Sequence, residues 1–257
     1  MKRFGLVGKK ISYSLSPLIH NAHFESLGIN AYYELIDIDD LSKHLDVLRT
    51  YDGFNITVPY KESFLTYLDE LSDEVKVIEA VNCVVVVNGK FKGYNTDIYG
   101  IYKTLSQHNL QLGRKKVLII GAGGAGKAVY YVLKNNTSHD IYVTNRTSAK
   151  ATELTKQVVD FTEFSKFSDE FDIIINCVTP EVPINLTNIK PNTTIIDINY
   201  QKHNINIPTS IRDQVKIIDG YAMLIYQAAR SFELWFNLAQ NVDAMYLALE
   251  RRSKNAY

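Results

Sequence analysis

The chain has 257 residues, enough to bury a sizeable core as one large domain or as two of ordinary size. Its 28 basic and 28 acidic residues balance, and its pI is near 7.0, so no net field attracts nucleic acid or anionic membranes non-specifically. A small-molecule partner is therefore expected.

The sequence predicts neither an export signal nor a metal site. Only five uncharged residues separate the basic start from further lysines, and no later apolar run reaches membrane-spanning length, which predicts a cytoplasmic protein. Cys83 and Cys177 lie far apart and are interpreted as core thiols. His20 and His23 are close, but no carboxylate or third ligand stands near them.

The first third of the chain alternates strand-like and helix-like stretches, the pattern of an α/β domain with a mainly parallel sheet. Ser16 can cap the first helix, Pro17 suits its first turn, and Gly28 can close it in a left-handed conformation. Asn88 and Gly89 predict a hairpin turn. Strands are predicted at 3–8, 32–38 and 53–58, the hairpin within 82–95, and helices at 16–28, 40–51, 61–71 and 96–110.

A second strand and helix pattern starts after residue 116. A buried strand over 117–120 runs into a glycine-rich helix start, and further strands follow in a doubly wound nucleotide-binding layout. The last helices, within 221–252, are too apolar for a solvated tail and are expected to fold back on the first domain. The later strands are predicted at 140–145, 171–176, 193–198 and 215–219. The expected domains are 1–102 with 226–257, for the substrate, and 103–225, for the nucleotide.

The run GAGGAG, residues 121–126, stands between that strand and its helix, where a dinucleotide fingerprint belongs. Gly121 allows the tight turn, Gly123 and Gly124 let the backbone approach a pyrophosphate, and Gly126 permits close packing of helix on strand. The pyrophosphate would lie over the free amides of the helix start, which include that of Ala125.

The end of the next strand indicates which dinucleotide binds. Where an NAD enzyme usually has an acidic residue, this chain has Asn145, Arg146, Thr147 and, a turn later, Lys150. A guanidinium can bind the 2′-phosphate of NADP, and no carboxylate stands there to accept a hydrogen bond from the ribose 2′-hydroxyl of NAD. NADP is therefore predicted. The alternative is a strand that ends in an exposed arginine with a threonine helix cap.

Polar residues cluster outside the nucleotide domain as well. In Gly53–Glu62, Phe54, Ile56 and Val58 should face one side of a strand, while Asn55, Thr57 and Lys61 share the other. The hydroxyls of Ser12, Ser14 and Ser16 beside a helix start suit a carboxylate. Further candidates are Asn82, Asn95 and Asp97.

These motifs, in this order from Ile11 to Trp235, resemble the shikimate dehydrogenase family. The resemblance implies NADP-dependent reduction of 3-dehydroshikimate to shikimate in a cleft between two domains, by a monomer or homodimer. It implies that Lys61 and Asp97 form the catalytic pair. The substrate residues it implies are Ser14, Ser16, Asn55, Thr57, Asn82, Gln227 and Tyr200, and Gly220 would lie near the nicotinamide.

The chemistry supports these roles independently. Hydride transfer to a ketone builds negative charge on oxygen, so the site needs a group that releases a proton as that charge appears. Lys61 fits this role beside an expected helix N-terminus, which disfavours an ammonium, while Asp97 would favour and orient it.

Several alternatives remain open at the level of sequence. The whole role of Thr96 and Asp97 could be to cap the helix that follows them. Gln227 could belong to a solvated stripe with Arg230. Glu79 and Cys83 replace a usual Gly and Thr, and the segments 177–183 and 200–206 lack residues that relatives have. One rival function is a paralogous quinate/shikimate dehydrogenase that accepts NAD or a substrate with an extra hydroxyl. The other is a non-catalytic nucleotide sensor, against which the retention of both Lys61 and Asp97 argues.

Overall fold

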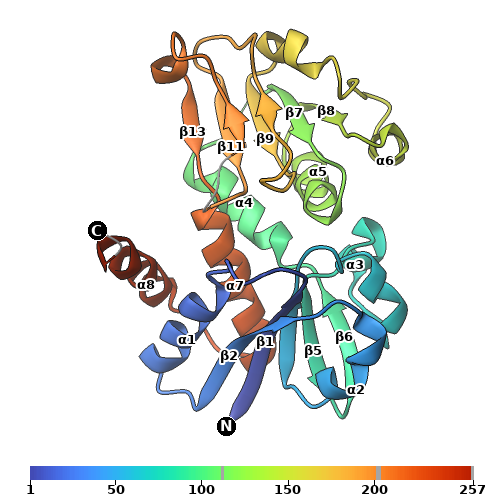
Figure 1. Ribbon diagram of the computed structural model, residues 1–257, viewed down its shortest axis with the longest axis vertical. Helices are drawn as coiled ribbons and strands as arrows, with labels where there is room; N and C mark the ends of the chain where they lie inside the picture. Colours follow the sequence, from blue (N-terminus) through green and yellow to red (C-terminus); the bar gives the residue numbers. More distant parts are fainter. Residues whose placement is uncertain (111–112, 201–203, 256–257) are drawn as a thin grey trace. The chain divides into compact units, whose positions relative to one another are not determined.

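The computed structural model describes residues 1–110, 113–200 and 204–255, and the chain divides into two compact units (Figure 1). Unit 1 comprises Met1–Gly100 and Leu224–Tyr257, and unit 2 comprises Ile101–Met223. Residues 201–203, within the atypical segment 200–206, lie outside the described residues.

Unit 1 contains a six-stranded mixed sheet in the order β2-β1-β3-β5-β6-β4 (Figure 1). The pairs β1–β2, β1–β3 and β4–β6 are parallel, whereas β3–β5 and β5–β6 are antiparallel. Asn88 and Gly89 both have positive φ at the tight β5–β6 turn, which confirms the predicted hairpin. The strands are β1 Lys2–Gly8, β2 Ala31–Asp37, β3 Gly53–Ile56, β4 Glu70–Leu71, β5 Cys83–Val87 and β6 Lys90–Tyr94.

The predicted helices of the first third are only partly correct. The helix expected at 40–51 is a 3₁₀ turn, η1 Leu41–Lys43, followed by the short α2 Leu45–Leu48. The helix expected at 61–71 is the 3₁₀ segment η2 Ser63–Tyr67. The last residues of the predicted helix are not helical because the Asp69 side chain accepts the Phe91 N–H at 2.8 Å and β4 pairs with β6. The helix α3 Asp73–Ile78 was not predicted.

The first helix, α1 Ser16–Ser26, has Leu15 at its N-cap position, where Ser16 was expected. Ser16 therefore lies inside the first turn and does not cap the helix; its N–H donates to the Ser14 hydroxyl at 3.2 Å. The predicted closing conformation of Gly28 is confirmed by its φ of 63°.

The sheet of unit 1 has a hydrophobic core on each face. One contains Phe54, Phe64 and Phe91, and the other contains Phe4, Phe24, Phe232 and Trp235. The helices α7 Tyr221–Phe236 and α8 Val242–Asn255 supply part of this unit, and α8 packs on α1. The Trp235 indole donates to the Val84 carbonyl at 3.0 Å, which fixes α7 on the sheet. A side chain at Gly53 would clash with that indole, 2.4 Å away.

Unit 2 contains a five-stranded, all-parallel sheet in the order β13-β11-β9-β7-β8 (Figure 1). An isolated parallel bridge between Val143 and Val158 extends it beyond β8, which gives the strand order of a Rossmann fold. The strands are β7 Lys116–Ile120, β8 Asp140–Thr144, β9 Ile173–Asn176, β11 Thr194–Asp197 and β13 Lys216–Ile218, with a small pair β10 Ile184–Asn185 and β12 Ile205–Asn206. The helices are α4 Asp97–Gln107, which starts in unit 1, α5 Gly124–Asn136 and α6 Ser148–Leu154, with 3₁₀ segments η3 Phe164–Glu170 and η4 Arg212–Gln214.

The described residues contain neither a membrane span nor a metal cluster. No helix among them is long and apolar enough to cross a bilayer. No group of three or more His, Cys, Asp or Glu side chains among them is arranged to hold a metal ion.

Candidate active site

The topology of unit 1 gathers the predicted polar residues at one edge of its sheet. Because β1 and β3 are parallel, the segments that follow them leave at the same edge, and these carry Ser14, Ser16, Thr57 and Lys61. Since β5 runs antiparallel to β3 and β6, its first residues and the end of β6 lie at this edge as well. They bring Asn82, Asn95, Thr96 and Asp97 there.

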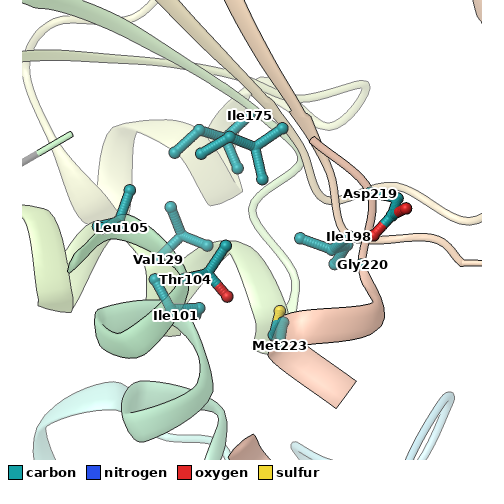
Figure 2. Close-up of a pocket in the computed structure, with 10 residues that line it drawn as sticks. Ile101, Thr104, Leu105, Val129, Ile175, Ile198, Asp219, Gly220 and Met223 are labelled. Carbon is teal, nitrogen blue, oxygen red and sulfur yellow. The ribbon is translucent and has the colours of Figure 1, made fainter. Parts of the chain in front are cut away.

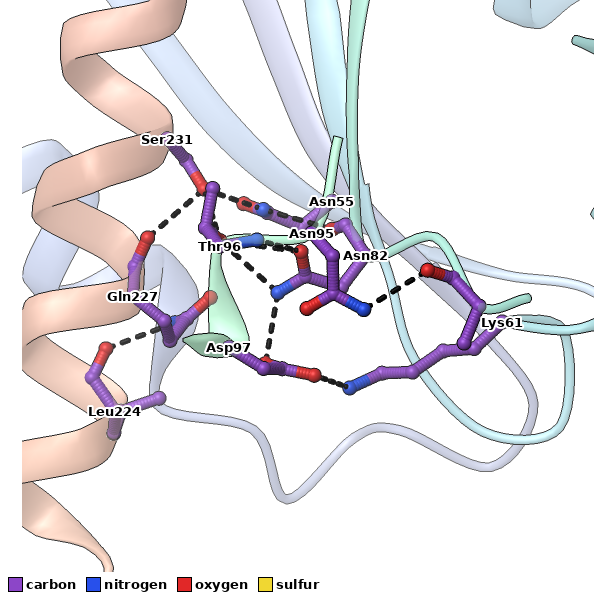
Figure 3. Close-up of polar contacts among 10 residues, drawn as sticks. Asn55, Lys61, Asn82, Asn95, Thr96, Asp97, Leu224, Gln227 and Ser231 are labelled. Carbon is purple, nitrogen blue, oxygen red and sulfur yellow. Dashed lines mark hydrogen bonds and ion pairs between the residues drawn. The ribbon is translucent and has the colours of Figure 1, made fainter. Parts of the chain in front are cut away.

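Lys61 and Asp97 form a largely buried ion pair. The Lys61 ammonium lies 2.5 Å from Asp97 Oδ2, and the two side chains are 16% and 5% exposed (Figure 3). The Lys61 carbonyl also accepts the Val81 N–H at 2.8 Å, which ties its backbone to the segment that leads into β5. A charge-assisted bond with so little solvent holds the ammonium in one direction.

Asn82 orients the same carboxylate from the other side. Its Nδ2 donates to Asp97 Oδ1 at 2.8 Å and to the Thr96 hydroxyl at 3.0 Å. Its Oδ1 accepts the Thr96 N–H at 2.6 Å (Figure 3). The side chains of Thr96 and Asp97 therefore belong to one hydrogen-bonded cluster with Asn82 and Lys61.

Asn55 lies behind this layer and is 3% exposed. Its Nδ2 donates to the Asn82 carbonyl at 3.0 Å and to the Ser231 hydroxyl at 2.8 Å, and its Oδ1 accepts the Tyr33 hydroxyl at 2.9 Å. Both amide hydrogens of Asn55 are thus used within the protein. The strand β3 ends at Ile56, so Val58 lies outside it and is 41% exposed, which corrects the expected alternation through residue 58.

Ser14, Ser16 and Thr57 lie at the start of α1 and just after β3. The Ser14 and Ser16 hydroxyls are 3.2 Å apart. The Thr57 methyl packs so closely against Gly8 that a side chain there would lie 2.6 Å from it. Among the described residues, no hydrogen bond joins these three side chains to the Lys61 cluster.

Gln227 is half-buried on α7, and its Nε2 donates to the Leu224 carbonyl at 2.8 Å (Figure 3). The exposed Arg230 instead pairs with Glu233 at 2.7 Å. Tyr200, the remaining predicted substrate residue, belongs to unit 2, where its ring lies 5.9 Å from that of Tyr221.

Burial shifts the pKa of three groups in unit 1. Burial raises the pKa of the Cys83 thiol to about 12, so Cys83 is a neutral thiol. Desolvation lowers the pKa of His20 to about 3 and that of His23 to about 4, so both rings are neutral at pH 7. His23 Nε2 accepts the Asn241 N–H at 2.8 Å, and His20 stacks on Tyr33 at 4.2 Å.

In unit 2 the glycine-rich turn has the geometry that a pyrophosphate cradle requires. Gly121 has a φ of 107°, a conformation that favours glycine. A Cβ on Gly126 would lie 1.9 Å from the Gly121 carbonyl oxygen, whereas one on Gly123 would meet nothing within 4 Å. Gly123 precedes α5, which begins at Gly124 and includes Ala125, so the free amides of this helix lie at the turn.

Asn145 connects this turn to the end of β8. Its Oδ1 accepts the Ala122 N–H at 3.0 Å, and its Nδ2 donates to the Thr147 carbonyl at 2.8 Å. Arg146, Thr147 and Lys150 are exposed beside it. Thr147 precedes α6, but its side chain makes no capping bond, so the simple cap interpretation is wrong.

Gly220 lines a small, largely apolar pocket in unit 2 (Figure 2). A Cβ on Gly220 would lie 2.1 Å from the Ile198 carbonyl oxygen, so no larger residue fits. The pocket walls also include Ile101, Thr104, Leu105, Val129, Ile175, Ile196, Ile198, Asp219 and Met223.

Sequence reasoning missed Ser231, which is fully buried. Its hydroxyl contacts Asn55, Thr96 and the Gln227 carbonyl (Figure 3). The available signal was its place four residues after Gln227, on the same helix face.

Comparison with known proteins identifies the family. Three family models match this chain. They are the shikimate dehydrogenase substrate binding domain over residues 6–84, shikimate/quinate 5-dehydrogenase over residues 104–222, and the shikimate 5′-dehydrogenase C-terminal domain over residues 220–250. Shikimate dehydrogenase (NADP(+)) of Pyrococcus abyssi is 38% identical over 269 residues, covering 99% of this chain and 100% of that protein.

Solved structures agree with this match. Shikimate 5-dehydrogenase from Thermus thermophilus, in complex with NADP(H) and shikimate, has a TM-score of 0.83 at 30% identity, covering 98% of this chain and 99% of that one. Quinate dehydrogenase from Corynebacterium glutamicum, in complex with NAD, has a TM-score of 0.85 at 26% identity, covering 97% and 99%. Three family models match in order along the chain, and a relative is 38% identical over 99% of this chain, so the chain belongs to the shikimate dehydrogenase family.

Proposed function

We propose that this protein catalyses the reversible, NADP-dependent reduction of 3-dehydroshikimate to shikimate, a step toward aromatic amino acids. The observation that carries the proposal is the buried pair of Lys61 and Asp97, with 2.5 Å between Nζ and Oδ2, at the sheet edge where unit 1 gathers its polar residues. A protein that only binds a nucleotide has no need of a held proton donor.

Lys61 is the proton donor in this reaction. When bound, NADPH supplies the hydride that reduces the ketone carbon. As the ketone oxygen gains negative charge, the Lys61 ammonium donates a proton to it, so that the C=O group becomes CH–OH. In the reverse direction, neutral Lys61 accepts the hydroxyl proton. Asp97 holds the amine in the required direction and stabilises its charged form.

Of the seven predicted substrate residues, six are proposed to bind the substrate directly and one, Asn55, to support another. Ser14, Ser16, Thr57 and Gln227 are proposed as direct ligands, because hydroxyls at the start of α1 suit a carboxylate and a half-buried amide suits a ring hydroxyl. Tyr200 in unit 2 is proposed as a further ligand. Asn82 retains an accepting lone pair for a ring hydroxyl, while Asn55, whose amide hydrogens are both used, is proposed to support Asn82.

Unit 2 is proposed to hold NADP. The Gly121–Gly126 turn and the free amides of α5, including those of Gly124 and Ala125, fit a pyrophosphate, since side chains would fill the cradle. Arg146, with Thr147 and Lys150, fits a 2′-phosphate, and Asn145 fixes their loop to the turn. Gly220 and its pocket are proposed to lie on the nicotinamide side.

An assay with both cofactors and both acids tests the proposal. Purified protein should oxidise NADPH with 3-dehydroshikimate and reduce NADP with shikimate, with much weaker activity on NAD or quinate. Comparable rates with quinate and NAD would favour the quinate dehydrogenase alternative. Binding of NADPH without turnover of either acid would favour a nucleotide sensor. The cytoplasmic location and the monomeric or homodimeric state stay predictions.

A further inference from the structure

The Ser231 hydroxyl joins three elements that meet behind the Lys61–Asp97 pair. Asn55 Nδ2 of β3 lies 2.8 Å from it, Thr96 Oγ1 before α4 lies 3.1 Å from it, and the Gln227 carbonyl of α7 lies 3.0 Å from it. Figure 3 shows these contacts converging on a side chain that is fully buried.

The chemistry of the partners fixes where the Ser231 proton points. Asn55 Nδ2 can only donate, and its orientation is set because the Asn82 carbonyl, which can only accept, lies 3.0 Å from that nitrogen. The Gln227 carbonyl can only accept. The Ser231 proton is therefore directed to Gln227, and the remaining lone pair of Ser231 accepts the hydroxyl proton of Thr96.

The same logic passes from Thr96 to Asp97. With its own proton directed at Ser231, the Thr96 oxygen accepts from Asn82 Nδ2 at 3.0 Å. The second Nδ2 hydrogen of Asn82 points at Asp97 Oδ1, 2.8 Å away, while Lys61 binds the other carboxylate oxygen. The bonds thus run in one direction from Asn82 through Thr96 and Ser231 to the α7 backbone.

We propose that Ser231 is a positioning residue for the reaction: through Thr96 and Asn82 it fixes the carboxylate of Asp97 that orients Lys61. This role rests on the proposed function. Without the hydroxyl, the Thr96 proton loses its acceptor and its nearest alternative is Asn82 Oδ1, at 3.2 Å, which already accepts the Thr96 N–H. The amide of Asn82 would then hold Asp97 less firmly, so the loss should fall on kcat.

The variant Ser231→Ala tests this, with Ser168→Ala as its matched control. Ser168 is also fully buried, and its hydroxyl likewise donates to a carbonyl four residues earlier, that of Phe164, but it belongs to unit 2. Ser231→Ala should lower kcat for 3-dehydroshikimate about tenfold, the scale of one hydrogen bond, and leave the KM for NADPH unchanged. Ser168→Ala should leave kcat unchanged.

A double-mutant cycle separates positioning from general structural support. If Ser231 acts through Thr96, then Thr96→Val combined with Ser231→Ala should lose no more kcat than Thr96→Val alone. Two independent roles would multiply the losses in kcat and overturn the proposal, as would a wild-type kcat in Ser231→Ala.

If Ser231→Ala does not fold, two variants of Thr96 test the proposal instead. Thr96→Ser should retain kcat and Thr96→Val should lose about tenfold in kcat, and equal activities of the two variants would overturn the proposal. A wild-type protein without 3-dehydroshikimate reductase activity would contradict the proposed function itself, and this role with it.

Discussion

The Lys61 ammonium and Asp97 Oδ2 lie 2.5 Å apart, although 36 positions separate the two residues in the sequence. They meet because β5 and β6 return the chain to the edge of the sheet at which β3 ends. The carboxylate is held at both oxygens, by Lys61 and by Asn82, so the amine has a fixed direction before any substrate arrives. In the proposed reaction this saves the cost of orienting a flexible lysine at each turnover.

Asp97→Asn should lower kcat by about 10- to 100-fold, because the amide no longer stabilises the ammonium and its N–H group would face either Lys61 or Asn82. The KM for NADPH should stay close to that of the wild type, since the proposed cofactor residues belong to unit 2. Steady-state kinetics of NADPH oxidation would measure both. A change confined to the KM for NADPH would contradict the role assigned to Asp97.

Arg146→Ala should raise the KM for NADPH by roughly 10- to 150-fold, which corresponds to about 1.5–3 kcal/mol for a charge-assisted hydrogen bond to the 2′-phosphate. Activity with NADH, which lacks that phosphate, should change little. Arg212→Ala removes another exposed cation of unit 2 and serves as the control. Equal losses with NADPH and NADH would show that Arg146 does not read the 2′-phosphate.

Two glycines of the same turn should respond differently to alanine. Gly126→Ala places a Cβ 1.9 Å from the Gly121 carbonyl oxygen, so it should destabilise unit 2 and abolish NADPH binding. Gly123→Ala meets no protein atom within 4 Å and should fold normally, but it should weaken NADPH binding by crowding the pyrophosphate. Thermal unfolding and NADPH titration would distinguish the two. Full NADPH affinity in both variants would remove the turn from the cofactor site.

The free energy of unfolding should fall as pH falls below about 6.5. Folding lowers the pKa of His20 to about 3 and that of His23 to about 4 by desolvation. Between these values and 6.5, the unfolded chain binds protons that the folded protein does not, so acid favours unfolding, and stability is recovered above 6.5. Each histidine should contribute about 1–2 kcal/mol between pH 6.5 and 5.

His20→Phe provides the comparison for this pH dependence. Neither ring nitrogen of His20 has a hydrogen-bond partner among the described residues, so a phenyl ring removes the titration without removing a bond. Urea unfolding at pH 7 and at pH 5 should show a smaller loss of stability in His20→Phe than in the wild type. An identical loss in both proteins would contradict the role of His20.

Local sequence signals predicted the features that depend on neighbouring residues. Gly28, the turn at Asn88 and Gly89, and the glycine-rich start of α5 are set by backbone preferences within a few residues, and all three are observed. The resemblance brought Glu79 to notice as a replacement for a usual glycine. The structure shows why a glycine suits this position: residue 79 ends α3 with a φ of 55°, in the left-handed region that favours glycine.

Features that depend on distant contacts were not predictable in this way. Residues 61–71 carry a helical pattern, but Asp69 and β4 are drawn into pairing with β6, which no local signal indicates. Ser231 looks like any small residue of an apolar helix, and its proposed role depends on Thr96, 135 positions away. The Lys61–Asp97 pair was predicted because the family resemblance supplied what spacing along the chain could not.

NADPH oxidation with 3-dehydroshikimate, measured for the wild type and for Lys61→Ala, tests the central claim most directly. The wild type should turn over, and Lys61→Ala should lose at least about 10²-fold in kcat, as expected for removal of a general acid, with a smaller change in the KM for 3-dehydroshikimate. A Lys61→Ala protein with a kcat close to that of the wild type would contradict the account.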